Sequence, residues 1–341
     1  GNTVIRGIQF PTPSQPVEGF SGVVAGSQPG TYLATTDNGF GTKANSADFL
    51  IRAYELTPDF KTAKGGSGEI TVGDFVQFAD PDGVIGFPIV RVATDRMLTG
   101  ADIDPESIQR DHRGDLWLGD EFGPWILHFD STGRLLAPPI ALPDDLRSPN
   151  NPAGANGVAN SRGIEAMAIS PNGRWLTVVL EGAVAGDDPF VRRIYRYDTV
   201  TGDFERLADY RVDVAGHMVA DAQALDQHRL LVLERDGVAA VDRHAYTVDT
   251  NDVAADGSAA KTELLDLAAI PDPDLVSLPE IHPGDVGIGD PFRVMCESSE
   301  AIYVVSHAEV LIGCDNNFPN AGRNPGLADD NEFIVVKAPG L

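Results

Sequence analysis

The chain has 341 residues and carries 51 Asp and Glu against 25 Lys and Arg, which gives a formal charge of -26. Such acidity excludes a surface that neutralises nucleic-acid phosphates and a polybasic membrane anchor. Apolar residues make up 42% of the chain, enough to bury a core, and no run approaches the ~18 apolar residues of a membrane span. The 36 Gly and 24 Pro are spread along the whole sequence, which favours many short strands over a few long helices.

The sequence repeats one pattern, in which two apolar strands flank a short turn and an acidic residue closes the second strand. In the clearest copy, Glu165 opens a run that turns at 171–173 and ends at Glu181. The opening and closing residues of the five copies are, in chain order, Ser21 and Asp37, Glu106 and Asp120 with Glu121, Glu165 and Glu181, Asp221 and Glu234 with Asp236, and Glu300 and Asp315. Each interval has the length of a hairpin, so antiparallel pairing should bring the opening and closing residues to the same end.

A third strand with alternating apolar residues follows these hairpins. We expect these third strands at 49–54, 126–130, 194–198, 238–242 and 333–336. Four antiparallel strands repeated about five times indicate an all-β fold, a β-propeller of five or six four-stranded blades. The uneven spacing of the copies leaves room for a sixth, degenerate blade or for insertions at 75–79 and 262–267. We expect one domain over 1–341, with the ring closed by the N-terminal strand at 5–9, and a β-sandwich is the alternative fold.

In a propeller the loops of successive blades gather at one mouth of a central channel. The acids of the hairpin ends should therefore lie close together, and carboxylates that close cannot all stay ionised without compensating charge. Oxygen-only ligands suit Ca²⁺ or Mg²⁺ rather than zinc or copper, so the cofactor we expect is Ca²⁺. Two alternatives remain open: a solvated acidic surface, and carboxylates that cap backbone N–H groups in turns.

The two cysteines, Cys296 and Cys314, are too few for a structural zinc cage or an iron–sulfur cluster. If their segments pair as a hairpin, both lie near its open end and a disulfide is geometrically possible. Such a bond would fit an oxidising compartment, and two unpaired buried thiols are the alternative.

Three segments carry a resemblance to a known family. They are Asp120 to Trp125, Arg162 to Gly173, and Asp315 to Pro319 followed by Asp330 to Ile334. In this order they resemble the bacterial phytase-like family described as having esterase-like activity, and the similarity runs from the Ser21 region to the end of the chain. The resemblance implies a propeller, a metal-assisted phosphoesterase, phytase or esterase activity, and a secreted or periplasmic protein. The chain departs from the family pattern at Asp221 and at Ser298 and Ser299, which precede Glu300.

We therefore expect a calcium-assisted hydrolase that acts, as a monomer, on small-molecule phosphate esters or other esters. The expected metal ligands are Asp120, Glu121, Glu165, Asp236, Asp315 and Asn316. Arg162 and Arg235 are expected to bind the phosphate, since guanidinium groups contact its oxygens bidentately. One of Glu181, Glu234 or Glu300 is expected to act as general base. The alternatives are a lactonase or carboxylic-ester hydrolase with one channel metal, and a non-catalytic ligand-binding propeller.

Overall fold

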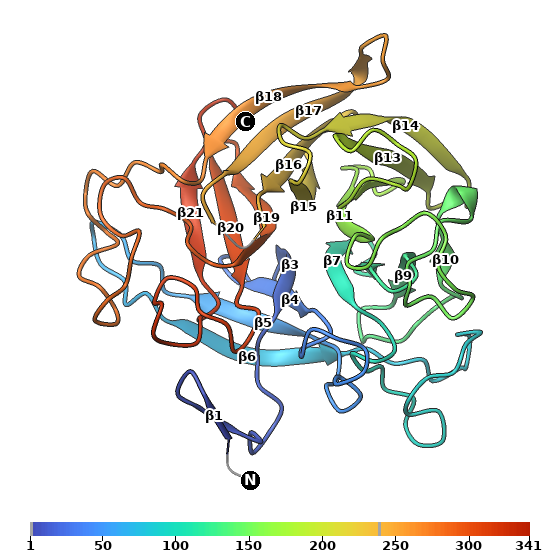
Figure 1. Cartoon of the computed structure of the whole chain (residues 1–341), viewed down its shortest axis with the longest axis horizontal. Coiled ribbons are helices and arrows are strands. Elements are labelled where there is room, and N and C mark those ends of the chain that lie inside the picture. Colours follow the sequence, from blue (N-terminus) through green and yellow to red (C-terminus); the bar gives the residue numbers. More distant parts are fainter. Residues whose placement is uncertain (1–2, 238–239) are drawn as a thin grey trace.

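The computed structural model describes residues 3–237 and 240–341, and it places five antiparallel sheets around a common axis (Figure 1). The innermost strands of the five sheets are β3, β7, β11, β15 and β19, which span Phe20–Ala25, Pro105–Arg110, Ile164–Ile169, Met218–Ala224 and Ser298–Ser306. This arrangement confirms the predicted all-β propeller and fixes the number of blades at five.

Four of the blades have four strands. Outside their innermost strands lie β4 (Tyr32–Thr36), β5 (Arg52–Pro58) and β6 (Ile70–Gln77); β8 (Leu116–Asp120), β9 (Trp125–Phe129) and β10 (Ile140–Ala141); β12 (Trp175–Leu180), β13 (Val191–Asp198) and β14 (Phe204–Arg211); and β16 (Arg229–Arg235), β17 (Arg243–Val253) and β18 (Ala259–Asp266). The fifth blade has three strands and is completed by β20 (Glu309–Asp315) and β21 (Phe333–Lys337). The only helical segment described is the short 3-10 turn η1 (Pro143–Asp145), and no described helix is long and apolar enough to cross a bilayer.

Three predicted segments take different roles. The third strand of the fourth blade is β17 rather than 238–242, of which 238–239 lie outside the described residues. The segments treated as insertions at 75–79 and 262–267 overlap the outer strands β6 and β18, so they leave no sixth blade.

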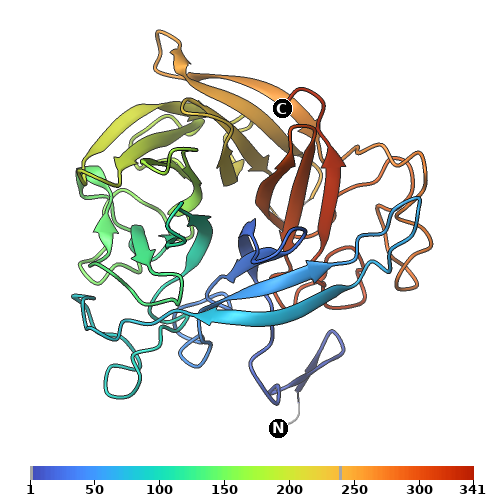
Figure 2. The ribbon, with the colours of Figure 1, turned by 180° about the vertical axis from the view of Figure 1, so that it is seen from behind.

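The N-terminal strand does not pair into the last blade. β1 (Thr3–Ile5) and β2 (Ile8–Phe10) form a separate hairpin outside the ring (Figure 2), and in the described chain β21 pairs with β20 alone. The prediction that residues 5–9 pair into the last blade and close the ring is therefore wrong. The ring closes by packing instead, because Phe20 of β3 shares an apolar cluster with Phe333, with ring centroids 6.1 Å apart.

The hairpin turns and the blade interfaces follow from local sequence. At the tip of the β11–β12 hairpin, Gly173 adopts a φ of +71°, which glycine reaches without strain, and the Asn172 side chain accepts the N–H of Arg174. Neighbouring blades bury apolar side chains between them, as Ile108 and Leu118 do in the cluster shared with the first blade. This packing holds the five innermost strands side by side around the axis.

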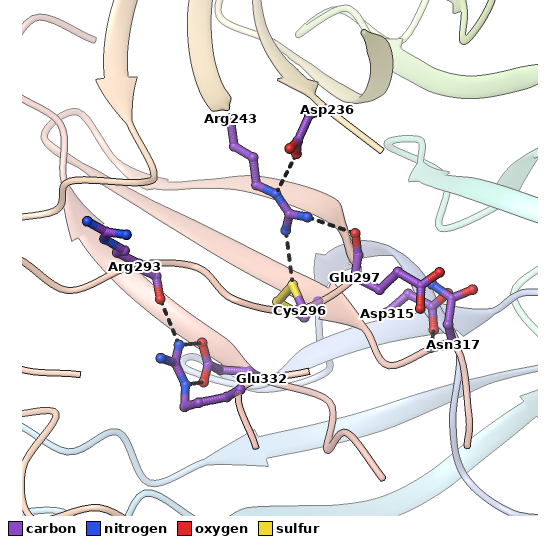
Figure 3. The surroundings of a disulfide bond; sticks show 10 residues. Asp236, Arg243, Arg293, Cys296, Glu297, Asp315, Asn317 and Glu332 are labelled. Carbon is purple, nitrogen blue, oxygen red and sulfur yellow. Dashed lines mark hydrogen bonds and ion pairs between the residues drawn. A yellow bond between two sulfur atoms is a disulfide. The ribbon is translucent and has the colours of Figure 1, made fainter. Parts of the chain in front are cut away.

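A disulfide joins Cys296 and Cys314, which confirms the predicted pair. Figure 3 shows that the buried Arg243 guanidinium lies beside it, and Nη2 donates to the main-chain oxygen of Glu297 at 2.7 Å. Nε of Arg243 donates to Asp236 at 3.2 Å, so the fourth blade is tied to the segment that leads into β19.

Candidate functional site

Each innermost strand carries a β-bulge at the same place. In the second blade, Pro105 pairs with Asp120 and Ser107 with Gly119, which leaves Glu106 as the extra residue. The extra residues of the five blades, here called the bulge ring, are Ser21, Glu106, Glu165, Ala220 and Glu300. A bulge re-aims one side chain out of the pleat, so the same irregularity places five side chains at equivalent positions of the five innermost strands.

A second set of residues follows from the same register. In each hairpin, the residue of the first strand that directly precedes the bulge pairs with a residue of the second strand. The residue that follows this partner on the second strand occupies an equivalent place in all five blades. These residues, here called the outer ring, are Asp37, Glu121, Glu181, Arg235 and Asp315. The two rings together hold seven carboxyl groups, and all of these are buried except that of Asp37, which is partly exposed.

The rings contain two overlapping groups of carboxyl oxygens. In one, atoms of Asp104, Glu106 and Glu121 lie within 4.8 Å of one another, and in the other the same holds for Glu121, Glu165 and Glu181. Asp104 lies two residues before the bulge and belongs to neither ring. Glu121 is shared, so the two groups are adjacent and form a pair of candidate cation sites bridged by one side chain.

The fourth blade supplies a cation where the other blades supply acids. Ala220 stands in the bulge ring and Arg235 in the outer ring. The buried Arg235 Nη2 lies 2.7 Å from Glu300 and 3.8 Å from Glu181, while its Nε has no hydrogen-bond partner among the described residues. Arg162 binds Glu181 from the rim, Nη1 to Oε2 at 3.1 Å, and its side chain is 38% exposed. Arg162 is therefore the guanidinium that solvent reaches, and Arg235 the one held inside.

Burial and mutual repulsion disfavour the ionised form of the carboxyl groups. Burial raises the pKa of Glu106, Glu121 and Glu165 well above the ordinary value, and neighbouring carboxylates raise it further. Burial also raises the pKa of Glu181, although Arg162 and Arg235 oppose the shift. Oxygen atoms are the only donors the triads offer, and Oε2 of Glu165 is buried without a hydrogen-bond partner. The residues present therefore fit hard divalent cations such as Ca²⁺ or Mg²⁺.

Three acids predicted at the mouth have their oxygens engaged by other groups. Both oxygens of Asp120 accept main-chain N–H groups, from Asp104 at 2.8 Å and from Gly123 at 2.7 Å. Glu234 is bound by Tyr210, Lys261, His217 and the N–H of Asp213. Asp236 accepts from Arg243 and from the N–H of Val241. These contacts favour a structural role for the three acids, and none of the three belongs to a carboxyl triad.

Asp221 is displaced from the site by one residue. The bulge residue of its strand is Ala220, and the Asp221 oxygens accept the N–H groups of Ala222 at 2.7 Å and Ile302 at 2.8 Å. It therefore links the innermost strands of the fourth and fifth blades.

Asp315 and Asn316, both expected as ligands, lie at the closure of the ring. Burial and the nearby Glu300 raise the pKa of Asp315 well above its usual value. The Asn316 amide is taken up by main-chain contacts, since its Oδ1 accepts the N–H of Gly19 at 3.1 Å and its Nδ2 donates to Asp329 at 3.2 Å. Asp315 stays in the outer ring, whereas Asn316 fastens the N-terminal segment to the fifth blade.

Two buried acids of the site were not among the predicted residues. Asp104 binds Asn38 through both oxygens, and Glu18 is 1% exposed, with neither oxygen hydrogen-bonded to any residue that the structure describes. Burial and the nearby Asp315 raise the pKa of Glu18 to about 8. Both acids precede a bulge, in a segment that carries no repeated acid, so the hairpin pattern gave no signal for them.

A five-bladed propeller with buried acids and a buried arginine at equivalent places of its innermost hairpins is the class of protein that the fold and site define. The chain belongs to the phytase-like family, described as having the esterase-like activity of phytase, whose model matches residues 15–318.

One curated relative and several solved structures are also similar. An uncharacterized secreted protein of Arthroderma benhamiae is 29% identical over 107 residues, which cover 25% of this chain and 20% of the relative. The match thus spans about a fifth of that protein. The PQQ-bound aldose sugar dehydrogenase of Streptomyces coelicolor is 12% identical, with 95% of this chain and 82% of that chain covered and a TM-score of 0.42. A luciferin-regenerating enzyme is 9% identical, with 93% and 77% covered and a TM-score of 0.41. These structural likenesses carry no information on activity.

Proposed function

We propose that this chain is a hydrolase of phosphate esters that works with divalent cations, Ca²⁺ being the expected ion. The observation that carries the proposal is the pair of carboxyl triads that share Glu121, beside the buried Arg235. Paired cation sites a few ångströms apart are common in enzymes that cleave phosphate esters. Membership of a family described by the esterase-like activity of phytase supports an ester substrate. The disulfide and the secreted relative support export.

The ligand set that we propose is Asp104, Glu106, Glu121, Glu165 and Glu181. When bound, divalent cations would neutralise these carboxylates and supply positive charge to the oxygens of a phosphate ester. Without that charge, seven ring carboxyls and a protein of net charge -26 would repel an anionic substrate. The chain can therefore attract phosphate only in its cation-loaded form.

The remaining charged groups fall into two roles. Arg162 lies partly exposed at the rim and is positioned to contact a phosphate first, and Arg235 has an unpartnered Nε that can donate deeper in the channel. Glu300 belongs to neither triad, and its Oε1 lies 2.7 Å from Nη2 of Arg235. Glu300 is therefore our choice for the general base that accepts a proton from attacking water.

A chelation experiment tests the proposal. The protein is treated with EGTA and assayed on p-nitrophenyl phosphate and phytate, and Ca²⁺ is then restored. We expect turnover to vanish and to return, and Glu121→Gln to lower kcat/KM at least 100-fold because it disrupts both triads (~3 kcal/mol). Asp115→Asn, in an acid and histidine cluster of the same blade outside the rings, is the matched control and should keep full activity. Full turnover in EGTA, or equal activity of the two variants, would refute the proposal.

A carboxylic-ester hydrolase is the second candidate, because the family description names an esterase-like activity. It predicts turnover of p-nitrophenyl acetate or of lactones with a single bound ion. Calcium binding by calorimetry separates the two, since the paired triads should take up two ions. Saturable calcium binding with no turnover of any ester would instead indicate a ligand-binding propeller.

A further inference from the structure

In the part of the chain that the structure describes, the fifth blade lacks the fourth strand that the other four blades possess, which leaves β21 as an open sheet edge. The hydrogen bonds from Cys314 N–H to Glu332 and from Ala338 N–H to Ala308 fix the alternation along this strand. The main-chain N–H and C=O groups of Ile334 and Val336 thus point toward β20. Those of Phe333, Val335 and Lys337 point away from β20, out of the sheet edge. Among the described residues, no hydrogen bond reaches the outward main-chain groups of those three. A strand edge of this kind is a template for another extended chain.

A cavity of about 720 Å³ runs along this open edge. All five residues of β21 line it, and because side chains alternate between the faces of a sheet, a cavity that touches all five must follow the edge itself. Its other walls come from residues in 58–70 of the first blade, in 270–292 and in 309–332. They contribute apolar side chains such as Phe60, Ile70 and Ile281, the last of which is 68% exposed.

The charge of the cavity indicates the kind of ligand. Eight Asp or Glu line it against three Lys or Arg, and the whole chain carries -26. A second acidic copy of the chain is thereby disfavoured, and a cationic ligand is attracted. A small apolar molecule would leave the outward N–H and C=O groups of β21 unsatisfied. An extended peptide pairs with them at every second residue and places alternate side chains in the apolar walls.

We propose that β21 and this cavity bind an extended, cationic peptide segment of a partner protein, which completes the fifth blade as its fourth strand. The site lies on the outer part of the blade and uses none of the ring residues, so it is independent of the proposed hydrolase activity. About five paired residues, or ~17 Å of strand, suffice to cover β21.

The test uses two fluorescein-labelled nine-residue peptides, one of alternating Val and Lys and one of alternating Val and Glu. We expect the Val–Lys peptide to bind at least tenfold more tightly by fluorescence anisotropy. In its complex, hydrogen exchange should slow at the amides of Phe333, Val335 and Lys337 and stay unchanged at Ile334 and Val336. Val335→Pro removes one outward N–H and should weaken binding about fivefold, whereas the control Val335→Thr keeps that N–H.

Several results would overturn this proposal. They are equal or absent binding of the two peptides, unchanged exchange at the three outward amides, and undiminished binding by folded Val335→Pro. A dimer that protects the same amides would assign the edge to a second copy. Uptake of the apolar dye ANS that the peptide does not displace would assign the cavity to a small molecule. If Val335→Pro fails to fold, the exchange measurement on the unmodified protein decides.

Discussion

Glu18 offers the most direct test of how much the burial of a carboxyl group at this site reduces the stability of the protein. Its carboxyl group is buried, neither oxygen is hydrogen-bonded, and its pKa is raised from 4.5 to about 8 by burial and then by Asp315. A carboxyl whose pKa is raised on folding contributes its full stability below pH 4.5 and loses it as the pH rises toward 8. Replacement by an uncharged isostere should therefore stabilise the cation-free protein, and more so at neutral than at acid pH.

The size of the effect follows from the two pKa values. Each pH unit between them costs about 1.36 kcal/mol, so ionisable Glu18 reduces stability by roughly 3 kcal/mol at pH 7 and by less than about 1 kcal/mol at pH 5. Glu18→Gln cannot ionise and escapes this loss. We expect its free energy of unfolding to exceed that of the wild type by roughly 3 kcal/mol at pH 7, with the difference shrinking toward pH 5.

Urea unfolding at pH 5, 6 and 7 in EGTA measures this difference. Glu69→Gln removes one exposed acid and serves as the control, for which we expect no pH-dependent gain. A Glu18→Gln gain of the same size at every pH, or a loss of stability at pH 7, would show that burial does not hold this carboxyl protonated.

Three further changes probe the scaffold of the site. Arg235→Met leaves Glu300 without its cation and should destabilise the EGTA-treated protein by about 3–5 kcal/mol in urea unfolding; a loss below ~1 kcal/mol would contradict the buried ion pair. Gly163→Ala would place a Cβ 2.8 Å from the Cα of Glu121, so we expect about 1–3 kcal/mol of destabilisation and weaker calcium binding by calorimetry, and unchanged values would count against this tight contact. Replacing both Cys296 and Cys314 by Ser opens a crosslink over 18 residues and should cost about 3 kcal/mol, measured as a lower urea midpoint that reductant no longer affects.

The hairpin repeat was sufficient to predict the propeller, because its signals are local. Alternating apolar residues and turn residues recur in each blade, and Glu106, Glu165 and Glu300 mark equivalent places on three innermost strands. Closure of the ring was not predictable in the same way. Residues 5–9 have the apolar alternation of a strand, but these residues belong to the local β1–β2 hairpin and its turn. Closure depends instead on packing between residues that are far apart in the chain.

The fourth blade shows where the sequence pattern misleads. Alignment by acidic residues places Asp221 and Glu234 at the ends of the hairpin, but the bulge shifts the register so that Ala220 and Arg235 take those places. A bulge adds one residue without a distinct sequence signature, and a residue displaced by one position points to a different neighbour. Glu18 was missed for another reason: it belongs to an irregular segment, and only the folded chain brings it beside Asp315.

Arg235 has a consequence for how a ligand can be oriented. Five equivalent blades would present any bound group with five indistinguishable rotational settings about the propeller axis. In the outer ring, a single guanidinium in place of an acid removes that degeneracy, because the electric field across the ring then points from one blade toward the others. An asymmetric anion bound there would therefore take one rotational setting in preference to the other four.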